Sequence, residues 1–315
     1  MNLAGRDLIT LHDLTPGEFS GILDLADEVK AHPLRHRETL ARKTLAMIFE
    51  KPSLRTRVTF ETGMTQLGGH AIYLAPSDIQ LGSRESIPDA ARNLERWVDM
   101  IMARTFRHGT ILELARHARI PVINALSDYS HPCQALADFQ TLREKLGDLR
   151  SLRLCYVGDG NNVCHSLLFA AAKTGAWLTV AAPEGYEPLR EVVDLAQADG
   201  RETGARIRLV RDPAEGVKGA NAVYTDVWAS MGQEAEAEKR ARVFKPYQVN
   251  EALMAGAEPG AFFLHCLPAH RGWEVTDPVA DAPTSLIFAQ AENRLHSQKA
   301  VLVLVGDQGA GTKHS

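Results

Sequence analysis

Short runs of β-branched and aliphatic residues alternate with longer amphipathic stretches along almost the whole chain. This alternation is typical of repeated strand–helix units around a parallel sheet, so the pattern predicts an α/β fold. The apolar runs predict strands over residues 44–49, 70–74, 100–103, 122–124, 153–157, 178–181, 207–210, 222–225 and 262–265.

Helix signals lie between these strands. Thr15 is a suitable cap, Pro16 fits the first helical position and Glu18 completes a capping box. A helix should therefore begin there and run to about residue 31. The pattern predicts two further helices, over 132–146 and from 290 to about 304.

The length and one polar segment indicate two domains. The chain has 315 residues, and a domain has roughly 150 residues on average. Residues 147–151 are polar and contain glycine, and a new predicted strand follows them directly. We therefore expect domains at 1–147 and 148–315.

Composition narrows the class of ligand. Hydrophobic residues make up 45% of the chain and charged residues 23%, which is typical of globular proteins. Lys and Arg number 35 against 39 Asp and Glu, so the net charge of −4 provides no general attraction for nucleic acid or anionic membranes. An anionic ligand therefore needs a local cluster of positive charge.

Cysteine usage and hydropathy bear on the compartment. The four cysteines lack paired spacing, which favours free thiols in a reducing compartment, and we expect the cytoplasm. Charged residues interrupt the first apolar stretch, so we expect no signal peptide. No stretch reaches the roughly 18 to 20 apolar residues of a membrane span, so we also expect no association with a membrane.

The charged segment at 232–244 predicts a solvated helix face. Glu236 and Arg240, and likewise Glu238 and Arg242, are four residues apart in the order that favours ion pairs on an exposed helix. We expect no chemistry from it.

A candidate anion site lies in the segment FEKPSLRTRVTFE at 49–61. Ser53 is a good cap, and Arg55 and Thr56 fall in the first helical turn. Backbone N–H groups, hydroxyls and a guanidinium at one helix start suit a phosphate. An ordinary capped helix with surface arginines remains an alternative.

A second candidate lies in SDYSHPCQALADF at 127–139. His131 and Gln134 are three apart at a helix start whose first residue is Pro132, so both side chains can reach one ligand. The imidazole suits a carbonyl oxygen and the glutamine suits an amide. The alternative is that His131 only caps the helix.

A glycine-containing motif, GDGNNV, follows the predicted strand at 153–157. It is similar to a dinucleotide-binding fingerprint but lacks the third glycine. Asn161 and Asn162 instead offer amides at the carboxyl end of a strand, where open α/β sheets bind ligands.

Three more motifs place polar groups at strand ends or at a helix start. Asp226 and Ser230 follow one predicted strand, and Cys266 follows another. Arg294 lies near the start of the last helix. Taken alone, the motifs at Asp226 and Cys266 also fit ordinary strand-end turns, and Arg294 also fits a surface arginine.

Together, the motifs are far more specific than each one alone. SLRTR, ART at 103–105, HPCQ, DGNN, DVWASMG, HCLP and AENR occur in this order. From about residue 49 to the last helix the chain resembles the aspartate and ornithine carbamoyltransferase family, and within it the ornithine-specific members. The resemblance implies two doubly wound parallel-sheet domains, with the last helix packing back on the first. It also implies transfer of the carbamoyl group of carbamoyl phosphate to the δ-amine of L-ornithine, giving citrulline and phosphate.

The resemblance further implies a role for individual residues. Carbamoyl phosphate would contact Ser53, Leu54, Arg55, Thr56, Arg104, His131, Gln134, Cys266, Leu267 and Arg294, with Gln80 reaching a neighbouring subunit's site. Ornithine would contact Asn162, Asp226, Ser230 and Met231. The catalytic roles would fall to Arg55, Arg104, His131 and Cys266. No metal or cofactor is implied, the assembly would be a homotrimer or a larger assembly of trimers, and Leu267–Pro268 would be cis.

Other functions stay open at this point. A carbamoyltransferase for putrescine or an acylated ornithine would share most motifs, although Asp226 and Ser230 favour an amino acid with a free α-ammonium group. An NAD-dependent dehydrogenase would explain GDGNN but leaves SLRTR and HPCQ without a role. A non-catalytic phosphate-binding module has no need of DVWASMG and HCLP.

Overall fold

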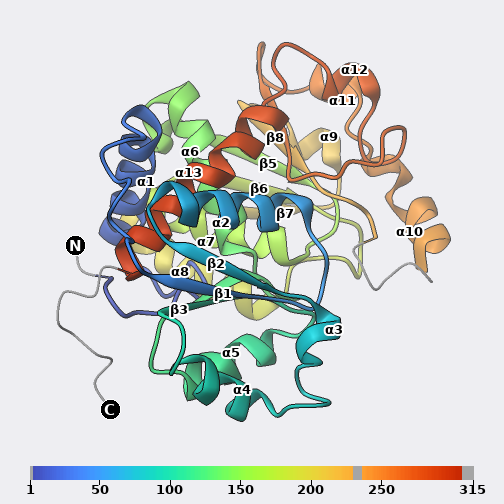
Figure 1. Cartoon of the computed structure of the whole chain (residues 1–315). Coiled ribbons are helices and arrows are strands. Elements are labelled where there is room, and N and C mark those ends of the chain that lie inside the picture. The colour runs from blue at the N-terminus through green and yellow to red at the C-terminus, as the bar shows by residue number, and fades with distance from the viewer. Residues whose placement is uncertain (1–2, 230–235, 307–315) are drawn as a thin grey trace. The chain divides into compact units, whose positions relative to one another are not determined.

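The computed structural model describes residues 3–229 and 236–306. Contacts within the chain divide these residues into two units. Unit 1 contains residues 3–140 and 293–306, and unit 2 contains residues 141–292. Each unit holds one sheet with its own helices (Figure 1). Within the described ranges, no helix has the length and apolar character needed to span a membrane.

Unit 1 is an α/β unit with four strands. These are β1 (Thr44–Phe49), β2 (His70–Leu74), β3 (Met100–Arg104) and β4 (Val122–Leu126). Its helices are α1 (Pro16–Ala31), α2 (Leu54–Gln66), α3 (Pro76–Ile79), α4 (Ile87–Leu94) and α5 (His108–His117). Helix α6 (Pro132–Leu146) begins in unit 1 and ends in unit 2. The last helix, α13 (Ile287–Gly306), begins in unit 2 and continues in unit 1.

The unit 1 sheet is parallel, in the order β2-β1-β3-β4. From β1 the chain moves to one side to form β2 and to the other side to form β3, so the order reverses between β1 and β3. Phe49 and Arg104, at the carboxyl ends of these two strands, are register partners. Open α/β sheets bind ligands at such a reversal.

Unit 2 has five strands. These are β5 (Arg153–Val157), β6 (Trp177–Ala181), β7 (Arg206–Val210), β8 (Ala222–Thr225) and β9 (Phe262–His265). Its helices are η1 (Leu149–Ser151), α7 (Asn162–Thr174), α8 (Arg190–Thr203), α9 (Pro213–Gly216), α10 (Ala237–Phe244), η3 (Lys245–Tyr247), α11 (Glu251–Met254) and α12 (Asp277–Ala280).

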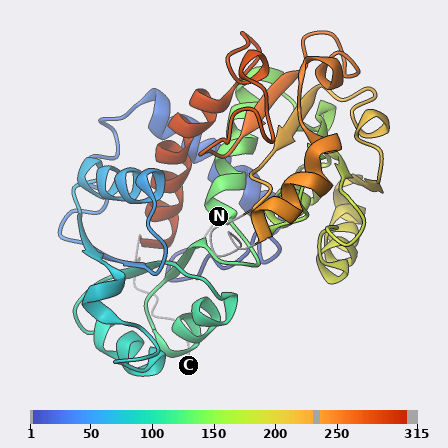
Figure 2. The ribbon, with the colours of Figure 1, turned by 90° about the vertical axis from the view of Figure 1, so that its right-hand side faces the viewer.

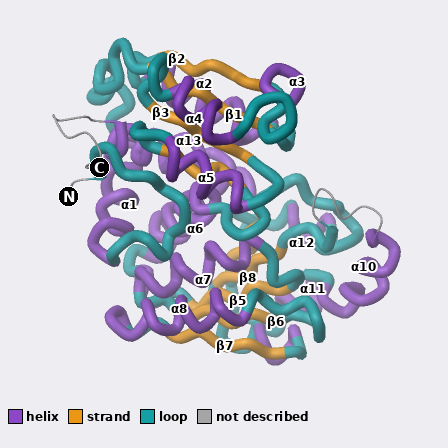
Figure 3. The backbone as a smooth tube through the Cα atoms, turned by 90° about the horizontal axis from the view of Figure 1, so that it is seen from below, coloured by secondary structure: helices purple, strands orange, loops and turns teal. Residues whose placement is uncertain are grey.

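The unit 2 sheet is also parallel, in the order β7-β6-β5-β8-β9. Figure 3 shows its strands β5 to β8 side by side in orange, and β1 to β3 of the other sheet likewise. The strand order reverses between β5 and β8, where Val157 and Thr225 are register partners. The second reversal therefore lies beside the motifs that follow β5 and β8.

The return of the last helix to unit 1 is confirmed. Figures 1 and 2 show α13, in red, beside α2, in blue. Lys299 of α13 donates to Gln66 of α2 at 3.1 Å. A side chain at Gly63 of α2 would meet the Cγ of Lys299 at 3.3 Å, so a glycine lets the two helices approach closely. The predicted α/β class with two parallel sheets is confirmed as well.

The predicted strands all form, each within two residues of its expected ends. The capping box at Thr15 and Glu18 is present. The last helix is longer than predicted, because it already begins at Ile287. The short helices α3, α9, α11 and α12, each of four residues, were not predicted, since one helical turn is too short to show an apolar period.

The prediction of a purely solvated face at 232–244 is wrong for Arg240. Its side chain is buried, and its Nη1 donates to Asp159 Oδ2 and to the carbonyl oxygen of Trp228, both at 2.9 Å. Arg242 and Glu238 are exposed as expected and 4.0 Å apart. Residues 232–235 lie outside the described ranges.

Candidate active site

The carboxyl end of β1 leads into a capped helix start. Ser53 has extended backbone angles, and its Oγ accepts a hydrogen bond from the Thr56 N–H at 3.3 Å. This confirms the predicted cap. The first N–H groups of a helix have no acceptor within the helix, and the helix dipole favours an anion there. The N–H of Leu54 belongs to this turn, while the Leu54 side chain is exposed.

A buried network joins three predicted residues. Arg294 of α13 donates from Nη1 to Gln134 Oε1 at 2.7 Å and from Nη2 to Thr56 Oγ1 at 3.2 Å. Gln134 in turn donates to Asp138 Oδ1 at 2.7 Å. All four side chains are buried. The sequence gives no sign of this network, because Thr56 and Arg294 are 238 residues apart.

His131 lies among three arginines. Its side chain is buried directly before α6. Burial lowers the pKa of His131 well below its usual value, and the positive charges of Arg294, Arg104 and Arg55 lower it further. The imidazole is therefore neutral at neutral pH, and the surroundings are strongly positive. Such surroundings favour an anion.

One of these arginines, Arg104, and a lysine of the same region, Lys51, are both buried cations at strand ends. Arg104 is the last residue of β3 and is buried, at the reversal of the strand order. Lys51 follows β1, is buried, and has its Nζ 4.6 Å from the centroid of the Phe106 ring. Lys51 belongs to the motif at 49–61, but no local pattern in the sequence distinguishes it from a surface lysine.

Gln80 is exposed, as is the side chain of Leu54, whereas Thr56, Arg104, His131 and Gln134 are buried. It ends α3 with a left-handed backbone at φ 45°, and its carbonyl oxygen accepts from the N–H groups of Ser83 and Arg84. These bonds fold the loop between α3 and α4 into a defined turn that faces solvent.

In unit 2 the ends of three strands bring Asp226, Asn161 and Cys266 together. Asp226 follows β8 and is buried. The Asn161 amide donates to Asp226 Oδ2 at 2.8 Å, and Cys266 Sγ lies 3.0 Å from Asp226 Oδ1. A carboxylate can still accept from further donors in this arrangement, since its two oxygens have about four lone pairs.

The turn after β9 fixes Cys266 and Leu267. Leu267 has φ 60° and precedes the cis bond to Pro268, as the resemblance implied. Its N–H donates to His265 Nδ1 at 2.8 Å. The neighbouring carbonyl groups are thereby held in one orientation.

Asn162 is the first residue of α7 and is half-buried. Ser230 and Met231 lie outside the described residues.

Asp226, His265 and Cys266 could in principle hold a metal ion, because their ligand atoms lie within 4.8 Å of one another. The ring of His265 does not fit that role. Its Nδ1 accepts from Leu267, and its Nε2 faces Glu274 Oε1 at 3.3 Å. Both ring nitrogens are therefore engaged by the protein, and we assign no metal site here.

The glycine motif after β5 serves packing. A side chain at Gly160 would place its Cβ 2.0 Å from the backbone nitrogen of Pro188, so only glycine fits. The glycine is thus required by the approach of the chain at Pro188, whereas in a dinucleotide fingerprint it would make room for a pyrophosphate.

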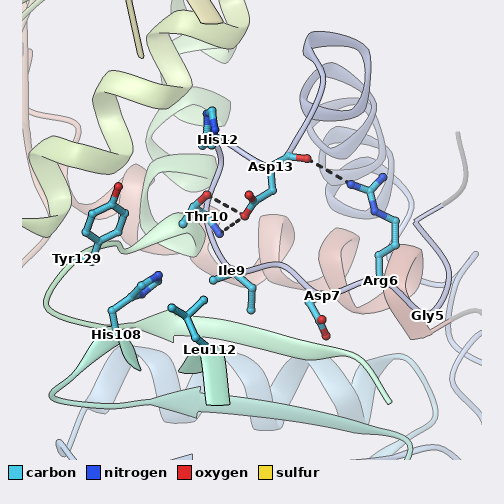
Figure 4. Close-up of a pocket in the computed structure, with 10 residues that line it drawn as sticks. All are labelled: Gly5, Arg6, Asp7, Ile9, Thr10, His12, Asp13, His108, Leu112 and Tyr129. Carbon is cyan, nitrogen blue, oxygen red and sulfur yellow. Dashed lines mark hydrogen bonds between the residues drawn. The ribbon is translucent and has the colours of Figure 1, made fainter. Parts of the chain in front are cut away.

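A cavity of about 780 Å³ in unit 1 is lined by none of the predicted site residues that the structure describes. It lies between the N-terminal segment and the start of α5 (Figure 4). Thr10 donates to Asp13 from both its N–H and its hydroxyl, and Arg6 donates to the Asp13 carbonyl oxygen. Because these polar groups bond to one another, we assign the cavity no part in the chemistry.

Two family models match the chain. The carbamoyl-P binding domain of aspartate/ornithine carbamoyltransferase matches residues 6–144, and the Asp/Orn binding domain matches residues 150–305. Ornithine carbamoyltransferase from Thermococcus kodakarensis is 54% identical over 97% of this chain and 98% of its own. The enzyme of that name from Bacillus subtilis is 50% identical over 99% and 98%.

Solved structures agree with these relatives. The structure of ornithine carbamoyltransferase from Pyrococcus furiosus superposes with a TM-score of 0.95 at 54% identity, covering 98% of this chain and 99% of that one. The one from Thermus thermophilus superposes with a TM-score of 0.85 at 48% identity, covering 94% and 97%. The chain belongs to the aspartate/ornithine carbamoyltransferase family.

Proposed function

We infer that this protein transfers the carbamoyl group of carbamoyl phosphate to the δ-amine of L-ornithine, giving L-citrulline and phosphate. The full-length identity of 54% to ornithine carbamoyltransferases supports this activity. The observation that carries the chemistry is the buried His131 amid Arg55, Arg104 and Arg294, next to the capped start of α2.

Unit 1 binds carbamoyl phosphate in this proposal. The phosphate takes the N-terminus of α2, where Ser53, Leu54, Arg55 and Thr56 supply hydroxyls, N–H groups and a guanidinium. Arg104 bridges the phosphate and the carbonyl oxygen, and His131 donates to the same oxygen. Gln134 contacts the carbamoyl amide, and Arg294 holds Gln134 and Thr56 in place.

Unit 2 binds ornithine. Asp226 accepts hydrogen bonds from the α-ammonium group, and Asn162 reaches the α-carboxylate. Ser230 and Met231 complete the amino-acid contacts by family resemblance. The carbonyl groups of Cys266 and Leu267, in the rigid turn after β9, accept from the carbamoyl NH2.

The reaction is nucleophilic substitution at the carbamoyl carbon. The uncharged δ-amine attacks, and negative charge grows on the carbonyl oxygen. Arg55, Arg104 and His131 stabilise that charge, and the C–O bond to phosphate breaks. An amine of this kind has a pKa of about 10.4, so the attacking form is a minor one at neutral pH. The proton passes to the departing phosphate, or to Cys266 in its thiolate form.

The family's subunit organisation extends the proposal. Gln80 lies in an exposed, ordered turn, which suits a residue that enters a neighbouring subunit's site. We therefore propose a homotrimer or an assembly of trimers. The family matches at 6–144 and 150–305 support a functional boundary near residue 147. The free cysteines of the described residues support a reducing compartment, the cytoplasm.

A citrulline assay with carbamoyl phosphate and several amines tests this function. L-ornithine should give citrulline, with a specificity constant at least about 30-fold above that of putrescine or an Nα-acylated ornithine. Both competitors lack the α-ammonium group, and an unpaired buried carboxylate costs at least about 2 to 3 kcal/mol. Equal specificity constants for ornithine and putrescine would reject the assignment and favour the putrescine enzyme.

A further inference from the structure

The amide of Asn161 has an orientation that the surrounding backbone fixes. Its Oδ1 accepts hydrogen bonds from the N–H groups of Val163 at 2.9 Å and Cys164 at 3.2 Å, which caps α7. Because the oxygen is held by two donors, the Nδ2 must point the other way. There it donates to Asp226 Oδ2 at 2.8 Å.

The Asp226 carboxylate is held at both oxygens. Oδ1 accepts from the N–H of Val227 at 2.8 Å and lies 3.0 Å from Cys266 Sγ. The Asn161 amide engages Oδ2. Rotation of the carboxylate about its terminal bond would break at least one of these contacts, and the side chain is only 5% exposed. Its direction is therefore set by residues from the ends of β5, β8 and β9.

The loop that carries Asn161 is itself rigid. Tyr156, within β5, donates from its hydroxyl to the Asp159 carbonyl oxygen at 2.8 Å. The N–H of Gly160 donates to the Tyr186 carbonyl oxygen at 2.8 Å, and the chain at Pro188 leaves no space for a side chain at Gly160. A rigid loop gives the Asn161 amide a fixed position from which it can orient Asp226.

We propose that Asn161 is a positioning residue for the second substrate: its amide holds the Asp226 carboxylate in the direction that receives the amino acid's α-ammonium group. This rests on the proposed function, in which Asp226 binds that group. Asn161 acts through Asp226 and contributes to binding even though it was assigned no substrate contact. Asn161 also caps α7, and suitable substitutions can remove the bond to Asp226 while they retain this cap.

Two variants separate the roles. Asn161→Ser retains a capping oxygen but is too short to reach Asp226. Asn161→Asp also retains the cap, but places a carboxyl oxygen where Nδ2 now lies. The matched control is Asn250→Ser, because Asn250 caps α11 by accepting from the Leu253 N–H at 3.0 Å and has no part in the site.

Asn161→Ser should raise the KM for ornithine about 10-fold to 100-fold, which corresponds to the loss of one hydrogen bond to a charged group. The Kd for carbamoyl phosphate, measured by calorimetry, should stay within about 2-fold. Asn250→Ser should leave both constants at the wild-type value.

Asn161→Asp adds a readout that a helix cap would not change. Two carboxyl groups in contact share one proton, and the protonated group can donate in place of the amide. As the pH rises the proton is lost and the groups repel each other, so the ratio of variant to wild-type kcat/KM for ornithine should fall. The titratable groups around this pair are Tyr156, Asp159, Cys164, His265 and Cys266. Arg240 is paired to Asp159, and the His265 ring faces Glu274.

Three results would overturn the positioning role. These are a wild-type KM in Asn161→Ser, a ratio for Asn161→Asp that does not change with pH, and a loss of folding in both variants, which would make Asn161 a residue of the fold alone. A wild-type protein that makes no citrulline would instead reject the proposed function.

Discussion

The buried ion pair between Arg240 and Asp159 should control the stability of unit 2. The side chains are 8% and 11% exposed, and Arg240 also holds the Trp228 carbonyl oxygen at 2.9 Å. Its guanidinium carbon lies 5.0 Å from the centroid of the Tyr186 ring. Replacing Arg240 with Met keeps most of the apolar contact but leaves a carboxylate and a carbonyl oxygen buried without their donor.

Breaking a buried pair on one side typically costs about 3 to 5 kcal/mol. We therefore expect Arg240→Met to lower the free energy of unfolding by that amount at pH 8, measured by urea unfolding followed by tryptophan fluorescence and circular dichroism. Adding Asp159→Leu should recover much of the loss, because the buried charge is then removed. Arg242→Met, on the same helix but at an exposed pair, is the control and should cause no measurable change.

The pH dependence of this loss has a defined sign. Burial raises the pKa of Asp159 to about 6, and Arg240 lowers it in part. Without Arg240 the pKa rises further, so the folded variant retains a proton that the unfolded chain releases. A group whose pKa is raised in the folded state contributes less to the free energy of unfolding as the pH rises towards that folded-state pKa. The cost of Arg240→Met should therefore be smaller at pH 5.5 than at pH 8. A cost below about 1 kcal/mol, or one that is equal at both pH values, would refute the reasoning.

Two further predictions concern catalysis. Arg55→Ala should reduce turnover at least about 100-fold while circular dichroism remains that of the wild type, because a donor to the developing charge is removed; near-normal turnover would exclude this role for the start of α2. If the Gln80 turn completes a neighbour's site, mixing Arg55→Ala protein with an inactive variant of this turn, then dissociating and reassociating them, should restore some citrulline formation in hybrid trimers. A fully active monomer would rule out the shared site.

Local sequence rules predicted the strands and the helix caps of this fold well. Most strands are short apolar runs buried on both faces, which need no other signal. The edge strands β2 and β7 contain no buried residue, yet their apolar residues still predicted them. Ser53 and Thr15 were predicted as caps because their bonds span only three residues. One-turn helices such as α3 were missed, since they have no period to detect.

Contacts between distant residues could not be predicted from these rules. The bond between Arg294 and Thr56 depends on α13 returning to α2. The four-residue spacing of Glu236 and Arg240 predicts an exposed pair on a solvated face. Arg240 is nevertheless buried, because it also pairs with Asp159, which lies 81 residues away in the sequence. The sequence predicts Asn161 as an amide at a strand end, but its bond to Asp226 depends on β5 and β8 being neighbours in the sheet.

The most direct test measures the two substrates separately in Asp226→Ala. In the proposed function carbamoyl phosphate binds unit 1, and the α-ammonium group of ornithine binds Asp226 of unit 2. Losing one partner of a buried charged contact costs about 2 to 5 kcal/mol, which weakens binding by well over tenfold. Calorimetry should therefore give a carbamoyl phosphate Kd close to that of the wild type, while citrulline formation is nearly abolished. Normal citrulline formation, or a loss of carbamoyl phosphate binding in a folded variant, would contradict the account.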